Sequence, residues 1–179
     1  MSSYIDTSII LARYLPSDPK FQAVDSFFKK SSGARYISEI SILELYCVFS
    51  RILRAGMLKP LPPGISFEDL SVEEKVTVVV EHAIRTWRLR IAATERSYLK
   101  LPVGKQTLQI GHELFEAIRV SAKLGLKTLD TLHLAYASTI RELEPDLQTF
   151  TTLDKEITAR REEIEKEMHI KVLEPTLSS

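Results

Sequence analysis

The sequence predicts an α/β fold, a single domain with a central parallel sheet of four to five short strands and helices on both faces. Two observations predict it. Short apolar segments typical of strands alternate with longer segments of helical periodicity, which favours parallel strands joined by helical crossovers. The length of 179 residues fits one domain, and a domain of this size buries roughly 70% of its unfolded surface without disulfides or a structural metal.

The first half of the chain alternates between expected strands and helices. Asp6 to Ser8 can cap the first helix, prolines at 16 and 19 end it, and Gly56 ends the third helix. The expected elements are a strand at 2–5, a helix at 9–15, a helix around 21–28, a strand at 35–38 and a helix at 40–55.

The second half is dominated by helical patterns. Ser71 to Glu74 reads as a capping box that opens a long helix, and Gly125 ends a later one. The expected elements are a loop at 59–64, helices at 71–99, 113–124, 129–143 and 155–168, and strands at 107–110, 147–153 and 170–173. We expect one domain over 1–175, with an extended loop and long-helix segment at 59–105 inside it, and a tail at 176–179.

Composition limits the classes of partner. Lys plus Arg equals Asp plus Glu at 24 each, so a nucleic acid would need a local basic patch. The single cysteine, Cys47, excludes an internal disulfide and, on an apolar helical stretch, reads as a small core residue. The first residues lack a basic leader, and no apolar run approaches membrane-spanning length, so we expect a soluble cytoplasmic protein.

Four acidic residues lie in apolar surroundings: Asp6, Glu44, Asp130 and Asp154. Carboxylates are rarely buried unless they are paired or bind a metal. Asp6 and Asp154 follow expected strands, at the sheet edge where ligands bind in such folds. Glu44 and Asp130 come near the starts of helices. The pattern therefore predicts that the four converge on a divalent metal ion.

Each acid also has a purely structural explanation. Asp6 and Asp154 can be helix N-caps. Glu44 can form a buried pair with Arg51, two helical turns away. His133 shares a face with Asp130 and can pair with it. We favour an ordinary core histidine, because a hard cation such as Mg²⁺ prefers oxygen ligands to imidazole.

Convergent carboxylates restrict the chemistry. Like charges at close range raise one another's pKa, and a divalent cation removes that penalty. An all-oxygen site without a His/Cys cluster selects Mg²⁺ or Mn²⁺ over Zn²⁺. Such an ion supports phosphodiester hydrolysis without a Ser–His–Asp nucleophile. No glycine-rich phosphate loop is present, so we expect no nucleotide cofactor.

Four ordered segments resemble the PIN domain family, the metal-dependent nuclease fold of VapC-type toxins. They span nearly the whole chain: Tyr4–Ser8, Ile37–Glu44, Gly125–Ala137 and Phe150–Lys155. The resemblance implies Asp6, Glu44, Asp130 and Asp154 as the catalytic, metal-binding acids. It further implies that Thr7, Thr152 and, more weakly, Ser38 hold carboxylates or a phosphate.

The resemblance also implies an activity and partners. Family members cleave RNA with Mg²⁺ or Mn²⁺, often as homodimers, and the toxins among them are silenced by an antitoxin protein. We therefore expect a metal-dependent endoribonuclease, the toxin of a toxin–antitoxin pair. The alternatives are a catalytically inactive PIN-like module that binds RNA or protein, a non-toxin RNA-processing nuclease, and a phosphohydrolase.

Basic residues near the expected site are candidates for substrate contact. Arg13, Arg51 and Lys155 lie closest to the acids in the expected fold. A second basic stripe on the predicted long helix, comprising Arg85, Arg88, Arg96 and Lys100, could contact RNA phosphates. We favour its reading as a solvated face balanced by Glu81 and Glu95.

Overall fold

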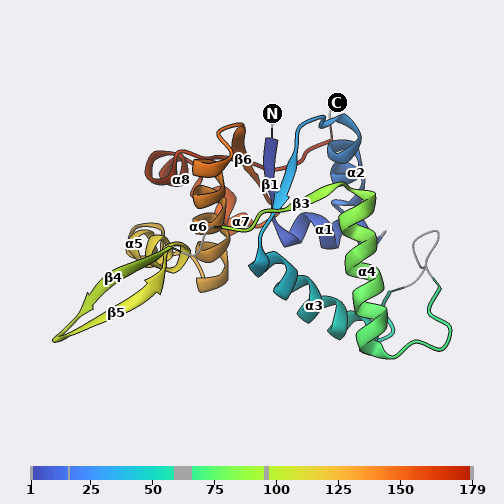
Figure 1. Cartoon of the computed structure of the whole chain (residues 1–179). Helices are drawn as coiled ribbons and strands as arrows, with labels where there is room; N and C mark the ends of the chain where they lie inside the picture. Colours follow the sequence, from blue (N-terminus) through green and yellow to red (C-terminus); the bar gives the residue numbers. More distant parts are fainter. Residues whose placement is uncertain (1, 16, 59–65, 95–96, 178–179) are drawn as a thin grey trace.

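A five-stranded, fully parallel sheet forms the centre of the molecule (Figure 1). The computed structural model describes residues 2–15, 17–58, 66–94 and 97–177. The strand order is β3-β2-β1-β6-β7. The strands are β1 (Ser2–Ile5), β2 (Arg35–Ile37), β3 (Leu89–Ile91), β6 (Leu147–Thr151) and β7 (Lys171–Leu173). The expected α/β class and parallel sheet are confirmed.

Helices cover both faces of this sheet. One face packs against α1 (Thr7–Tyr14), α2 (Phe21–Lys30), α3 (Glu39–Arg54) and α4 (Val72–Thr86). The other packs against α5 (His112–Leu124), α6 (Thr128–Leu143), α7 (Lys155–Ala159) and α8 (Arg161–Met168).

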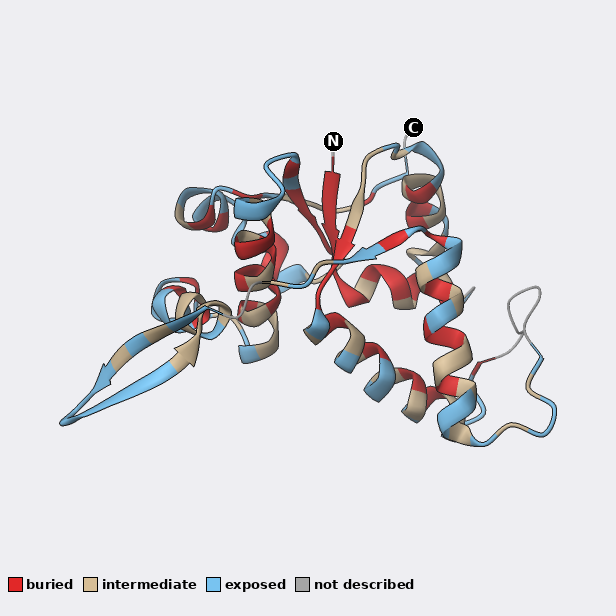
Figure 2. Cartoon of the chain, in the orientation of Figure 1, coloured by how far each residue is buried: buried red, intermediate tan, exposed pale blue. Residues whose placement is uncertain are grey.

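The alternation of strand side chains divides the buried residues into two cores. Ile5 and Ile37 join the core under α1 to α4, whereas their neighbours Tyr4 and Tyr36 join the core under α5 to α8. This follows from the period of two along a strand. Figure 2 shows the buried residues concentrated in the sheet and the helix faces that meet it.

The predicted helix at 71–99 is wrong in its second half. α4 begins with the predicted capping box at Ser71 but ends at Thr86, and Arg88 has a left-handed φ of 51°. Residues 89–91 then pair with β2 as a strand that the sequence pattern did not predict. No glycine or proline marks the break. Sheet pairing decides the structure here, because it overrides the local helical pattern.

The basic stripe therefore does not lie on one helix. Arg85 is in α4, Arg88 follows that helix, and Lys100 belongs to a strand, β4 (Tyr98–Val103). Arg96 and the predicted loop at 59–64 lie outside the described residues.

A separate antiparallel hairpin projects from the body of the molecule (Figure 1). It consists of β4 (Tyr98–Val103) and β5 (Gln106–Gly111). The strand predicted at 107–110 is present, but it belongs to this hairpin and not to the central sheet.

Two smaller expectations also change. The helix predicted at 155–168 divides into α7 and α8 at Arg160, whose φ of −103° and ψ of 17° depart from helical values. Cys47 is exposed, so its reading as a core residue is wrong. Among the described residues, no helix has both the length and the apolar character that crossing a membrane requires.

Candidate metal centre

The four predicted acids come from four different elements at the carboxyl edge of the sheet. Asp6 directly follows β1, and Asp154 follows β6, the strand paired with β1. Glu44 lies in the second turn of α3, and Asp130 lies in the first turn of α6. The parallel arrangement brings the ends of β1 and β6 together, so Asp6 and Asp154 reach the same edge.

Asp6 is held by hydroxyl groups. Ser8 Oγ and Thr152 Oγ1 each donate to Asp6 Oδ2 at 2.6 Å, and Asp6 is only 7% exposed. Although Asp6 occupies the N-cap position of α1, its side chain makes no capping hydrogen bond, so the capping explanation is wrong for this residue. Ser8 was not predicted as a site residue. Its position one residue beyond the Asp-Thr pair was the available signal.

Thr152 joins Asp6 to Asp154. Its buried hydroxyl donates to Asp6 and accepts a hydrogen bond from the Asp154 backbone N–H at 2.9 Å. Asp154 Oδ1 accepts from the backbone N–H groups of Glu156, at 2.7 Å, and Ile157, at 3.3 Å. The capping explanation therefore holds for Asp154, whose charge nonetheless acts on its neighbour Asp130.

Asp130 lies in surroundings that disfavour its ionised form. Burial, followed by the negative charges of Asp154 and Asp6, raises the pKa of Asp130 to about 6. Its Oδ2 is buried and has no hydrogen-bond partner among the described residues. A buried carboxylate oxygen without a donor is costly, so this position favours a cation as a partner.

Glu44 pairs with a histidine. His133 Nε2 lies 2.9 Å from Glu44 Oε2, and His133 Nδ1 lies 2.9 Å from the Tyr4 hydroxyl. His133 is buried, as a core histidine would be, but its hydrogen bonds go to Glu44 and Tyr4 and not to Asp130. Its place three residues after Asp130 pointed to that acid, so no local signal indicated Glu44.

Neighbouring groups overcome the effect of burial on Glu44. Burial alone would raise its pKa, but the hydrogen bond with His133 and the charge of Arg51 bring the pKa below its ordinary value. The buried Thr7 hydroxyl makes no hydrogen bond of regular geometry among the described residues. Like Asp130 Oδ2, it is a buried polar atom available to a ligand.

These groups together fit a divalent cation. One potential ligand atom each from Asp6, Glu44 and His133 lies within 4.8 Å of the others. Asp130 adds a further carboxylate, one oxygen of which has no hydrogen-bond partner within the residues that the structure describes. Since every donor except the imidazole is an oxygen, the set suits Mg²⁺ or Mn²⁺.

Three of the remaining predicted residues interact with groups other than the four acids. Ser38 is fully buried and bonds to Tyr4, so it can support the site only indirectly. Arg13 forms an ion pair with Asp25 at 2.8 Å, and Lys155 forms one with Glu174 at 2.8 Å.

Two basic residues act electrostatically on the acids. Arg51 is exposed, and its charge lowers the pKa of Glu44. Lys127, which was not predicted, lowers the pKa of Asp130 from the start of α6. Both are therefore within electrostatic range of the proposed ion.

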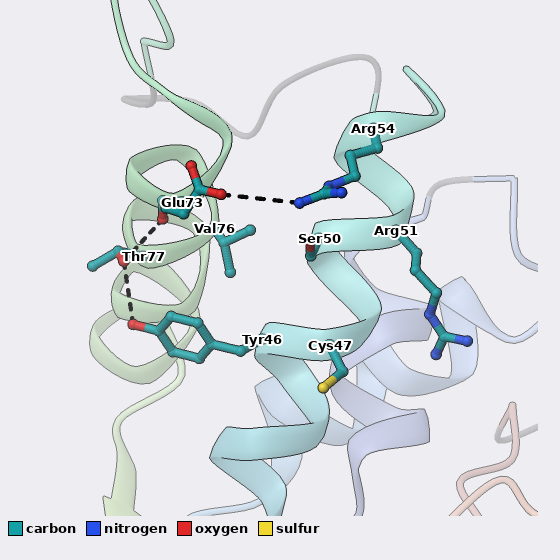
Figure 3. Close-up of a pocket in the computed structure, with 8 residues that line it drawn as sticks. All are labelled: Tyr46, Cys47, Ser50, Arg51, Arg54, Glu73, Val76 and Thr77. Atoms are coloured by element: carbon teal, nitrogen blue, oxygen red, sulfur yellow. Dashed lines mark hydrogen bonds and ion pairs between the residues drawn. The ribbon is translucent and has the colours of Figure 1, made fainter.

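A groove of about 640 Å³ runs between α3 and α4 (Figure 3). On the α4 side, Thr77 accepts a hydrogen bond from Tyr46 at 3.3 Å. At the far end of the groove, Arg54 and Glu73 lie 3.9 Å apart. Its lining residues are Tyr46, Cys47, Ser50, Arg51, Arg54, Glu73, Val76 and Thr77. Arg51 links this groove electrostatically to Glu44.

A protein-family model matches nearly the whole chain. The model described as the PIN domain matches residues 3–163, a range that includes the positions of the four acids. Comparison with curated proteins gave no match.

Three solved structures share the fold. A chain of the VapBC2 complex from Rickettsia felis, bound to a DNA fragment from its promoter, has a TM-score of 0.53 and 14% identity, covering 97% of this chain and 98% of that one. A FitAB chain bound to the IR36 DNA fragment has a TM-score of 0.52 and 13% identity, covering 99% of this chain and 98% of that one. VapC20 from Mycobacterium tuberculosis, a toxin that cleaves the sarcin–ricin loop, has a TM-score of 0.50 and 11% identity, covering 88% of this chain and 93% of that one.

Proposed function

The chain belongs to the PIN domain family, and on this premise we propose that it is a Mg²⁺- or Mn²⁺-dependent endoribonuclease. One observation carries the proposal. Asp130 retains a buried carboxylate oxygen that has no hydrogen-bond partner in the described part of the chain, beside the charges of Asp6 and Asp154. A nuclease that uses a metal ion needs such an uncompensated cluster, whereas a purely structural cluster would be neutralised by the chain itself.

The residues of the chain divide the work among them. Asp6, Glu44 and Asp130 would hold the ion, which would supply a Lewis acid for phosphodiester hydrolysis. Ser8 and Thr152 fix one oxygen of Asp6, so its other oxygen would be available to the ion. Asp154 adds negative charge while its Oδ1 caps α7.

Basic residues close to the acids contact the RNA phosphates in this proposal. Arg51 and Lys127 act electrostatically on Glu44 and Asp130, so a phosphate near the ion lies within their range. The exposed position of Arg51 in the α3–α4 groove gives a bound strand a path away from the acids.

The biological role we propose is that of a toxin controlled by an antitoxin. This rests on the similarity of the fold to chains of VapBC2 and FitAB, both of which form complexes with DNA. A protein partner, a homodimeric state and a cytoplasmic location belong to the same proposal. Growth arrest on expression of the chain, relieved by a small neighbouring reading frame, is the expected outcome.

Cleavage of single-stranded RNA with defined metal ions tests the activity. Wild type is expected to cleave with Mn²⁺ or Mg²⁺ and to stop in EDTA. Asp6→Asn removes one ligand charge and is expected to lower the rate at least about 100-fold, as loss of a metal ligand does. Asp146→Asn, an exposed acid before β6 and on the opposite edge of the sheet, is the matched control.

The outcomes separate the alternatives. Cleavage that continues in EDTA, or equally in Asp6→Asn, contradicts metal-dependent hydrolysis at these acids. RNA binding without cleavage at any metal concentration identifies an inactive RNA-binding module instead. Hydrolysis of small phosphate esters without RNA cleavage identifies a phosphohydrolase.

A further inference from the structure

An unbroken chain of buried hydrogen bonds runs from the start of α3 to the Glu44 carboxylate. The Tyr4 hydroxyl lies 2.7 Å from Ser38 Oγ and 2.9 Å from Ser41 Oγ. It also lies 2.9 Å from His133 Nδ1, and His133 Nε2 continues to Glu44 Oε2 at 2.9 Å. Tyr4, Ser38 and Ser41 are fully buried and His133 is 1% exposed, so the chain reaches solvent only at its Glu44 end.

The capping box at the start of α3 sets the direction of the first bonds. Ser38 Oγ accepts from the Ser41 backbone N–H, and Ser41 Oγ accepts from the Ser38 backbone N–H. Each serine hydroxyl is thus an acceptor toward the backbone and has its own proton left to donate. Both hydroxyls lie within hydrogen-bond distance of the Tyr4 oxygen, so both can donate to it. The Tyr4 proton is then free to go to His133.

The far end of the chain requires the same direction. An ionised carboxylate can only accept, so the bond between His133 and Glu44 needs a proton on Nε2. A neutral imidazole that carries its proton on Nε2 has an acceptor at Nδ1, which is what a donating Tyr4 hydroxyl requires. A phenol keeps its proton at neutral pH, so the Tyr4 hydroxyl can make this donation.

From this agreement we infer that Tyr4 and His133 form a positioning pair that fixes Glu44 for the ion and keeps His133 from ligating it. With Nε2 protonated, the imidazole has no lone pair to offer at the position nearest the acids. The ion then meets oxygen ligands only, which favours Mg²⁺ and Mn²⁺ over Zn²⁺. The inference rests on the metal site proposed above.

The nitrogen chemistry of His133 gives the first test, and it needs no metal. In ¹⁵N NMR spectra of the metal-free protein, His133 is expected as the neutral form protonated on Nε2. Tyr4→Phe removes the donor to Nδ1 and is expected to release the Nδ1-protonated form. A wild-type His133 protonated on Nδ1, or a Tyr4→Phe spectrum identical to wild type, overturns the inference.

Calorimetric titration with Mn²⁺ alone and with Zn²⁺ alone gives the second test. His133→Gln retains an N–H that can reach Glu44, whereas His133→Asn is too short for it. Loss of a group that orients a metal ligand costs about 10- to 100-fold in affinity. That loss is expected for His133→Asn, with His133→Gln within about threefold of wild type. In Tyr4→Phe, the Nδ1-protonated form of His133 has a lone pair on Nε2 that can bind a metal ion. This is expected to raise the affinity for Zn²⁺ relative to that for Mn²⁺ by about tenfold or more.

A matched control exists in the same chain. Tyr14 is another buried tyrosine whose hydroxyl lies 2.6 Å from a histidine nitrogen, Nδ1 of His82. Its ring contacts are with Phe49, His82 and Trp87. Tyr14→Phe is expected to leave the His133 tautomer and both metal affinities unchanged, and circular dichroism verifies that each variant folds.

The outcomes also separate this inference from the proposed function. The positioning role alone is overturned if wild type, His133→Asn and His133→Gln bind Mn²⁺ equally well. It is also overturned if Tyr4→Phe leaves the Zn²⁺ affinity relative to the Mn²⁺ affinity unchanged. A wild-type protein that binds no Mn²⁺ overturns the metal site and this role together.

Discussion

At the scale of single residues, the four acids differ because their neighbours differ. Two hydroxyl groups hold Asp6, a histidine holds Glu44, and backbone N–H groups hold Asp154. Asp130 Oδ2 has no such donor among the described residues. Asp130 is therefore the acid whose ionised form costs the metal-free protein most.

Asp130→Asn is expected to stabilise the metal-free protein at neutral pH. The pKa of Asp130 in the folded protein, about 6, lies above the ordinary 3.8. The folded state therefore binds the proton more tightly, and the destabilisation is absent below about pH 4, grows up to about pH 6 and then stays constant. After allowance for solvent screening, the gain at neutral pH is of the order of 1–2 kcal/mol. Urea unfolding of wild type and Asp130→Asn in EDTA, at about pH 4 and at neutral pH, measures the gain. An equal difference between the two proteins at both pH values contradicts this origin of the gain.

Arg51 is expected to contribute one phosphate contact. Arg51→Ala should weaken RNA binding for all sequences alike and lower the slope of log affinity against log salt by about 1. Fluorescence anisotropy with a labelled RNA over a salt series measures this, in Ca²⁺ or EDTA to prevent cleavage. Arg119→Ala, which removes a charge that is paired with Glu116 on α5, is the control. An unchanged slope in Arg51→Ala removes Arg51 from the RNA path.

At the scale of elements, α3 carries more of the site than any other helix. Its capping serines start the chain of hydrogen bonds to His133, its second turn carries Glu44, and Arg51 follows two turns later. Because residues seven apart share a helix face, Arg51 and Glu44 lie on the same side. This placement follows from the helical period and was predictable.

The turn between α5 and α6 sets the position of Asp130, and Gly125 is its key residue. Gly125 ends α5 with a left-handed φ of 59°. A Cβ there would meet only Arg160 Nη2 at 3.9 Å, so space permits alanine but the backbone conformation disfavours it. Gly125→Ala is expected to lower the free energy of unfolding by about 1 kcal/mol. Denaturant unfolding measures this, and an equal or more stable variant contradicts the assigned backbone strain.

Element boundaries failed where tertiary contacts decide the structure. Proline, glycine and capping signals located the ends of α1, α3 and α5, because those signals act within one turn of the chain. The end of α4 has no such signal, since Arg88 adopts a positive φ without being glycine. Only pairing with β2 explains why residues 89–91 leave the helical pattern.

At the scale of the whole molecule, the parallel sheet explains why the acids could be predicted together. Strand ends at one edge converge, so the sequence sufficed to place Asp6 and Asp154 near each other. The role of His133 could not be predicted, because its partners Tyr4 and Glu44 lie 129 and 89 residues away in the chain. Contacts at that separation depend on the packing of α3 against α6, which no local pattern encodes.

The proposed role of the acidic cluster is to hold a divalent metal ion. Anomalous diffraction from crystals grown with Mn²⁺ locates such an ion without assuming any activity. We expect an anomalous peak bounded by carboxylate oxygens of Asp6, Glu44 and Asp130, with His133 Nε2 still bonded to Glu44. A peak elsewhere, a peak ligated by His133, or no peak at saturating Mn²⁺ would contradict it.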